Sequence, residues 1–189
     1  MMSQIFVSGH KSPDTDSIAA ALSYSYLKRR LGMDAVAVRA GEINKESRFA
    51  LDYFNLEEPM LVTSVARKNP EDEKQKVILV DHNESKQTID GMDDAEVLEI
   101  IDHHRFGDFE SENPIFILVR PVGCVNTVIY GLYKANHIKP SREIAGIMLS
   151  AIISDTVLFR SPTTTEEDKE TAKELAEIAG VDYEAYGME

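Results

Sequence analysis

The sequence has a single cysteine, no tryptophan and no apolar run of the roughly 18 residues that a membrane-spanning helix needs. One cysteine excludes an internal disulfide and a zinc cluster built on cysteines. The 20 Lys and Arg residues are outnumbered by 33 Asp and Glu, and the net charge of −13 argues against nucleic acid as a partner. The N-terminus lacks the apolar core of a signal peptide, so we expect a cytoplasmic protein that does not contact a membrane.

The apolar pattern is that of a single α/β domain spanning residues 1–189, and 43% hydrophobic residues suffice for its core. Short β-branched runs alternate with longer helical patterns, which predicts a doubly wound, mostly parallel sheet flanked by helices. The expected strands are 4–8, 35–39, 76–80, 97–101 and 115–119, and the expected helices are 16–31, 45–54, 125–136, 141–153 and 165–179.

Helix ends are marked by capping residues. Asp16, Ser141 and Thr165 are candidate N-caps, and Gly180 suits the position just after the last helix. The first helix is expected to bury one face, formed by Ile18, Ala21, Leu22, Ser25 and Tyr26.

Imidazoles and carboxylates recur where the predicted strands end. They follow the first strand in the segment GHKSPDTD (9–16), follow two later strands as Asp-His and Asp-His-His, and close the apolar helix IAGIMLSAIIS. The residues are His10, Asp14, Asp16, Asp81, His82, Asp102, His103, His104 and Asp155. Because ligands of an open parallel sheet bind at the carboxyl ends of its strands, we expect these side chains to converge there.

Histidine nitrogens and aspartate oxygens suit borderline divalent ions such as Mn²⁺ and Co²⁺, and more than four ligands indicates at least two ions. Each piece has a structural alternative: an Asp-His pair can simply begin a loop, and Asp16 can cap a helix. A carboxylate at a helix C-terminus, as at Asp155, is electrostatically disfavoured and favours a compensating cation. The joint occurrence favours a metal site over these separate explanations.

These residues, together with several longer stretches, resemble the N-terminal catalytic domain of family II inorganic pyrophosphatase, a member of the DHH phosphoesterases. The stretches are VDHNE (80–84), IDHHRFGDFE (101–110), RPVGCVNT (120–127), EIAGIMLSAIISDTVLFRSPT (143–163) and ELAEIAGVD (174–182). The resemblance covers nearly the whole chain.

The resemblance implies a role for each residue of the constellation. His10 and Asp14 would bind one ion, Asp81 would bridge to a second, and Asp16, His103 and Asp155 would complete the second site. His104 would face the substrate, Asp102 would orient an imidazole, and Arg105 would neutralise or position the substrate loop. Cys124 is expected to be a small buried residue and not a nucleophile.

The implied reaction is hydrolysis of magnesium pyrophosphate by a hydroxide shared between two Mn²⁺ or Co²⁺ ions. The family's C-terminal substrate-binding domain has no counterpart in the sequence, so weak turnover is expected, and the resemblance also implies a homodimer. Two alternatives stay open. One is a DHH phosphodiesterase acting on short oligonucleotides or cyclic dinucleotides, and the other is a metal-stabilised dimerisation domain without turnover.

Overall fold

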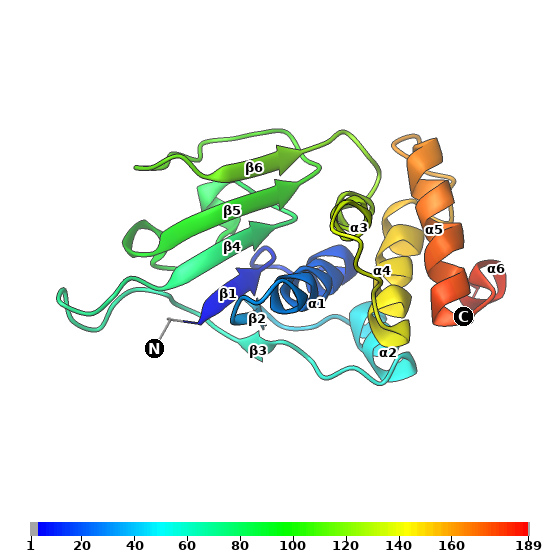
Figure 1. The fold of residues 1–189 in the computed structure, drawn as a ribbon, viewed down its shortest axis with the longest axis horizontal. Coiled ribbons are helices and arrows are strands. Elements are labelled where there is room, and N and C mark those ends of the chain that lie inside the picture. Colours follow the sequence, from blue (N-terminus) through cyan, green and yellow to red (C-terminus); the bar gives the residue numbers. More distant parts are fainter. Residues whose placement is uncertain (1–3, 189) are drawn as a thin grey trace.

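The computed structural model describes residues 4–188 and contains one parallel sheet of six strands (Figure 1). The strands are β1 (Ile5–Ser8), β2 (Ala35–Arg39), β3 (Met60–Leu61), β4 (Lys76–Val80), β5 (Glu96–Asp102) and β6 (Phe116–Val119). Their order across the sheet is β3-β2-β1-β4-β5-β6, and every pair is parallel. The chain leaves β1 toward β2 and later returns to its other side, so the order reverses between β1 and β4. This doubly wound topology confirms the predicted fold class.

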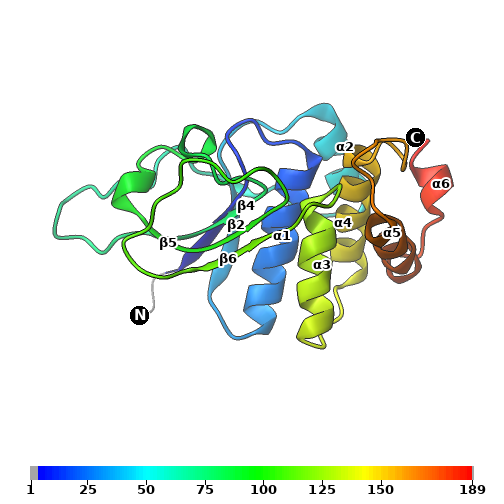
Figure 2. The same ribbon diagram turned by 90° about the horizontal axis from the view of Figure 1, so that it is seen from above.

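The helices are α1 (Thr15–Arg30), α2 (Lys45–Tyr53), α3 (Val125–Ala135), α4 (Arg142–Asp155), α5 (Glu166–Ala179) and α6 (Tyr183–Tyr186), with 3₁₀ turns at Ser85–Gln87 and Met92–Asp94. Helices α1 and α3 pack on the sheet, α4 packs on α1, and α5 packs on α4 (Figure 2). Strand β3 and helix α6 are too short for the sequence pattern to have revealed them. The helices of residues 4–188 include none that is long and apolar enough to cross a membrane.

Helix α1 is buried nearly all round, because it lies between the sheet and α4. Ile18 and Ala21 of the predicted face are buried, but so are Ala19 and Tyr24 on other faces of the helix. The prediction of a single buried face was therefore too narrow. Alanine is frequent here because small side chains allow the sheet and α4 to approach α1 closely.

The N-cap of α1 is Asp14 and not Asp16: its Oδ1 accepts a hydrogen bond from the backbone N–H of Ser17 (2.9 Å). Asp16 lies inside the first turn, where its side chain turns away from the cap position. The other helix-end predictions are confirmed. Ser141 and Thr165 cap α4 and α5, and Gly180 ends α5 in the left-handed region at φ 70°.

The second face of the sheet carries a smaller core formed by Val38, Val77, Leu79 and Ile100 with Val65 and Ile89. Connecting segments and the 3₁₀ turns cover this face, whereas helices build the larger core on the first face. The strand order reverses between β1 and β4, and folds of this kind hold their ligands at the carboxyl ends of the strands beside such a reversal.

Candidate metal centre

Four segments meet at the carboxyl edge of the sheet. The loop after β1 brings His10 and Asp14, the end of β4 brings Asp81, the end of β5 brings His103, and α4 ends at Asp155. Asp81 has a left-handed backbone at φ 62°, and its N–H donates to the carbonyl of Ile101 (2.9 Å), so the chain turns sharply as it leaves β4. Asp tolerates this region better than most residues.

The first group contains His10, Asp14 and Asp81, whose ligand atoms lie within 4.8 Å of one another. The Nε2 of His10 is 3.3 Å from Asp81 Oδ2 and 3.6 Å from Asp14 Oδ1. Burial opposes the charged form of His10, but the two carboxylates outweigh it and raise the pKa of His10 to about 10. Burial also opposes ionisation of Asp81, yet the neighbouring imidazoles of His10 and His103 hold the pKa of Asp81 below its usual range.

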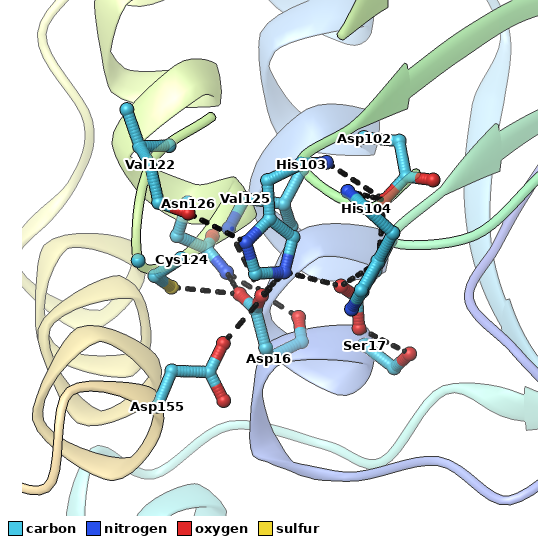
Figure 3. Close-up of polar contacts among 12 residues, drawn as sticks. Asp16, Ser17, Asp102, His103, His104, Val122, Cys124, Val125, Asn126 and Asp155 are labelled. Atoms are coloured by element: carbon cyan, nitrogen blue, oxygen red, sulfur yellow. Dashed lines mark hydrogen bonds and ion pairs between the residues drawn. The ribbon is translucent and has the colours of Figure 1, made fainter. Parts of the chain in front are cut away.

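The second group contains Asp16, His103 and Asp155, again within 4.8 Å, and these side chains point toward one another (Figure 3). The Nε2 of His103 lies 3.4 Å from Asp16 Oδ2 and 4.0 Å from Asp155 Oδ2. Burial and the charge of Asp16 raise the pKa of Asp155 to about 11, and burial with the charge of Asp81 raises the pKa of Asp16 to about 6. These carboxylates repel one another in a largely buried site, so a cation would favour their ionised forms.

Asp81 connects the two groups. Its Oδ2 faces His10, and its Oδ1 lies 3.2 Å from His103 Nε2. The side chain is 1% exposed, and Oδ1 accepts no hydrogen bond from any residue that the structure describes. A buried carboxylate oxygen without a donor is costly unless a cation binds it. The Nδ1 of His103 is 2.9 Å from the carbonyl of Val122, which leaves Nε2 available to bind a cation. The donor set therefore fits divalent cations such as Mn²⁺.

His104 lies beside the cluster and is half-exposed. Its Nδ1 is 2.7 Å from Oδ1 of the buried Asp102, so Nε2 is the nitrogen that remains to face a ligand. Asp102 thus orients His104, while the backbone orients His103. Arg105 lies farther out: its side chain is 86% exposed and its Nε bonds Glu84 Oε1 (2.9 Å). The observed partner of Arg105 is thus the loop after β4.

Sequence reasoning missed several supporting residues. Ser17 donates to Asp81 Oδ2 (2.8 Å), Asn83 donates to Asp102 Oδ2 (2.7 Å), and Asn126 donates to Asp16 Oδ1 (2.6 Å). Asn83 and Asn126 lie in two of the stretches that carried the resemblance, but no role could be given to them without the structure. Cys124 is buried as predicted, and burial raises its thiol pKa. Ser17 also explains Gly9, where an added Cβ would lie 2.6 Å from the Ser17 side chain.

The family model described as "DHH family, N-terminal domain" matches residues 4–152. Relatives from Exiguobacterium sp. and Bacillus licheniformis, each described as "Probable manganese-dependent inorganic pyrophosphatase", are 53% identical over 188 residues. The alignments cover 100% of this chain but only 59% of each relative's length.

Two solved structures match this chain over nearly its whole length. A Methanococcus jannaschii protein described as "putative family II inorganic pyrophosphatase" is 43% identical with a TM-score of 0.88, over 98% of this chain and 60% of that one. An exopolyphosphatase-related protein from Bacteroides fragilis shares the fold at 19% identity and a TM-score of 0.70, over 97% of this chain and 54% of that one.

Proposed function

The chain belongs to the DHH family, and on that premise we propose that it binds two divalent cations and uses them to hydrolyse inorganic pyrophosphate to two phosphates. The observation that carries the proposal is the pair of one-histidine, two-aspartate groups that meet at Asp81. Manganese is the expected metal because the relatives from Exiguobacterium and Bacillus are described as manganese-dependent. Co²⁺ suits the same donors.

In the proposed site His10, Asp14 and Asp81 hold one cation, and Asp16, His103, Asp155 and the shared Asp81 hold the other. A pair of such cations lowers the pKa of water and neutralises phosphate oxygens, which is the charge stabilisation that phosphoryl transfer needs. Asp16 and Asp81 would fix the positions of the cations most firmly, because both are buried and accept hydrogen bonds from Asn126 and Ser17, respectively. A magnesium complex of pyrophosphate suits a chain with a net charge of −13.

His104 is the proposed substrate-facing residue. Asp102 holds its Nδ1, so the imidazole can present Nε2 to a phosphate oxygen and donate a hydrogen bond when protonated. The hydrogen bond to Asp102 raises the pKa of His104, which favours the protonated, donating form. Arg105 is a weaker candidate for substrate binding, because reaching a phosphate would require it to leave Glu84.

The chain spans 59% of the length of the relatives it matches, so metal binding is the primary test and turnover the second. Purified protein should retain two Mn²⁺ per chain after gel filtration, measured by elemental analysis. Phosphate release should then be faster from magnesium pyrophosphate than nucleotide release from a dinucleotide. One ion or none per chain would refute the proposal, and preference for the dinucleotide would favour a phosphodiesterase. Two tightly bound ions without turnover of either substrate would favour the metal-stabilised structural domain.

We also propose that residues 1–189 form one domain and that two copies associate through the edge of the sheet. Strand β6 is an edge strand, and its Phe116 and Ile117 are 49% and 43% exposed. Unpaired edge strands with apolar side chains favour pairing with another chain. Light scattering should give the mass of a dimer, and Ile117→Lys should shift it toward the monomer. A monomeric parent protein would refute the association.

A further inference from the structure

The carboxylate of Asp16 is held by the N-terminus of α3, a helix far from it in the sequence. Its Oδ2 accepts from the backbone N–H of Val125 (2.9 Å), and its Oδ1 accepts from Cys124 Sγ (2.9 Å) and Asn126 Nδ2 (2.6 Å), as Figure 3 shows. Asp16, Cys124 and Asn126 are each 0% exposed. The first turn of α3 therefore supplies both its unpaired N–H and its positive end to a carboxylate that water does not reach.

The orientation of the Asn126 amide is fixed from behind by Ser23. The Ser23 hydroxyl donates to Asn126 Oδ1 (2.9 Å), so the amide presents its NH₂ group to Asp16. A flipped amide would place its oxygen against the carboxylate, and the Ser23 hydroxyl would then have to accept from the amide instead of donating to it. Ser23 is itself 0% exposed, so no water competes for this arrangement. The chain of contacts runs from α1 to α3 and back to Asp16 in α1.

These contacts leave Asp16 with one direction in which to bind a cation. Both acceptor directions of Oδ1 are used by Cys124 and Asn126, while Oδ2 has one donor and faces His103 Nε2 at 3.4 Å. We propose that Asn126, locked by Ser23, is a positioning residue that aims Asp16 Oδ2 at the cation of the second group. This inference rests on the proposed two-cation function.

The effect is specific to the second group. Asp16 is absent from the first group, where Ser17 holds the shared Asp81 through its Oδ2. Asn126 contacts Asp16 and Ser23 but none of His10, Asp14 and Asp81 through a hydrogen bond in the described part of the chain. Loss of the Asn126 side chain should therefore lower the affinity for one cation only. Residues that hold a metal ligand in place in this way typically change metal affinity about 10- to 100-fold.

The test compares Asn126→Ala with Thr127→Ala, the next residue of the same helical turn. Thr127 is 1% exposed, and its hydroxyl donates to the buried Asp168 (2.6 Å), away from the cation groups. Both changes remove a buried hydrogen bond from the start of α3, so both are expected to lower the unfolding temperature. Only Asn126→Ala should alter Mn²⁺ binding.

Titration with Mn²⁺, followed by electron paramagnetic resonance, gives the dissociation constant of each ion and the spectrum of a coupled pair. We expect Asn126→Ala to raise the dissociation constant of one Mn²⁺ ion about 10- to 100-fold and that of the other less than about threefold. At limiting Mn²⁺ the spectrum of the coupled pair should be lost. Ser23→Ala keeps the Asn126 amide but leaves it free to turn, so it should lower the affinity for the same ion by less than Asn126→Ala does. It decides the matter if Asn126→Ala does not fold.

Several results would overturn the inference while leaving the two-cation function intact. One is that the Mn²⁺ dissociation constants are unchanged in both Asn126→Ala and Ser23→Ala. Another is that Asn126→Ala weakens binding of both ions equally, and a third is that Thr127→Ala weakens binding of the same single ion. If the parent protein itself binds fewer than two ions, the proposed function fails and the inference falls with it. The parent titration therefore separates the two failures.

Discussion

The two groups of the candidate centre have the same composition, one histidine and two aspartates, but different surroundings. In the first group the Asp14 side chain is 51% exposed and two of the three residues come from one short loop. In the second group Asp16 is 0% exposed, and its three residues come from α1, the turn directly after β5 and the end of α4. Identical ligands can thus be assembled by local chain geometry in one case and by tertiary packing in the other.

The difference determines what each group does without a cation. In the first, the protonated His10 sits between Asp14 and Asp81 and balances part of their charge. In the second, the raised pKa values of Asp16 and Asp155 show that one histidine does not balance two buried carboxylates. The first group can thus form ion pairs without a cation, whereas the second holds more buried negative charge than its histidine balances.

The largest expected effect comes from Asp81→Ala, because Asp81 is proposed to bind both cations. We expect loss of both Mn²⁺ ions and of any pyrophosphate turnover, measured by elemental analysis and phosphate release. Asp90→Ala is the control: Asp90 is 70% exposed and pairs with Lys11, next to His10, but belongs to neither group. Two ions retained by Asp81→Ala would remove this residue from the site.

The next effect separates the groups. Asp155→Asn should lower the affinity for one ion. It should also stabilise the metal-free protein by roughly 1 kcal/mol or more, because it removes a carboxylate that is buried without a compensating positive charge. Asp14→Asn should lower the affinity for the other ion but should not stabilise the metal-free protein, since Asp14 caps α1 and interacts with His10. Chemical denaturation of the metal-free variants measures both. If both variants, or neither of them, were more stable than the parent protein without metal, the proposed difference between the two groups would be wrong.

The first group could be predicted from the sequence more completely than the second. His10 and Asp14 share one loop, and Asp81 directly ends an apolar strand, so strand periodicity alone places them together. Asp16 was expected as a helix cap from the local pattern and as a ligand of the second cation from the resemblance, but no local signal could show that α3 would approach its side chain. For the same reason Asn126 and Ser23 carried no signal: their roles depend on how α1 and α3 pack. The strand pattern predicted the sheet, but not the loop-covered second face.

The pH dependence of the metal-free protein should follow from the raised pKa values. Asp16, Asp155, His10 and His103 all have a pKa above the ordinary value, with His103 raised to about 9 because its interactions with Asp81 and Asp16 outweigh the opposing effect of burial. The folded chain therefore binds more protons than the unfolded chain between about pH 6 and pH 9, so stability falls as pH rises.

Thermal unfolding at pH 6, 7.5 and 9 measures this trend. With saturating Mn²⁺ the fall should be smaller, because cations replace the bound protons and bind more tightly as pH rises. Binding should accordingly release protons into a weakly buffered solution. A metal-free protein whose unfolding temperature rises from pH 6 to pH 9 would contradict the charges assigned to both groups.

The smallest effect concerns the turn that follows Asp155. Val157, Leu158 and Phe159 all have left-handed backbones, at φ 48°, 51° and 66°, a region that disfavours β-branched and bulky residues. Val157 is 59% exposed, so Val157→Asn loses little packing and should stabilise the metal-free protein by about 0.5–1 kcal/mol. Val157→Ala, which keeps a Cβ without a preference for this region, should gain less. Because the turn fixes where α4 ends, an unchanged affinity for both ions would show that packing of α4 alone aims Asp155. Weaker binding of one ion alone would instead show that the strained turn helps to position Asp155 in the second group.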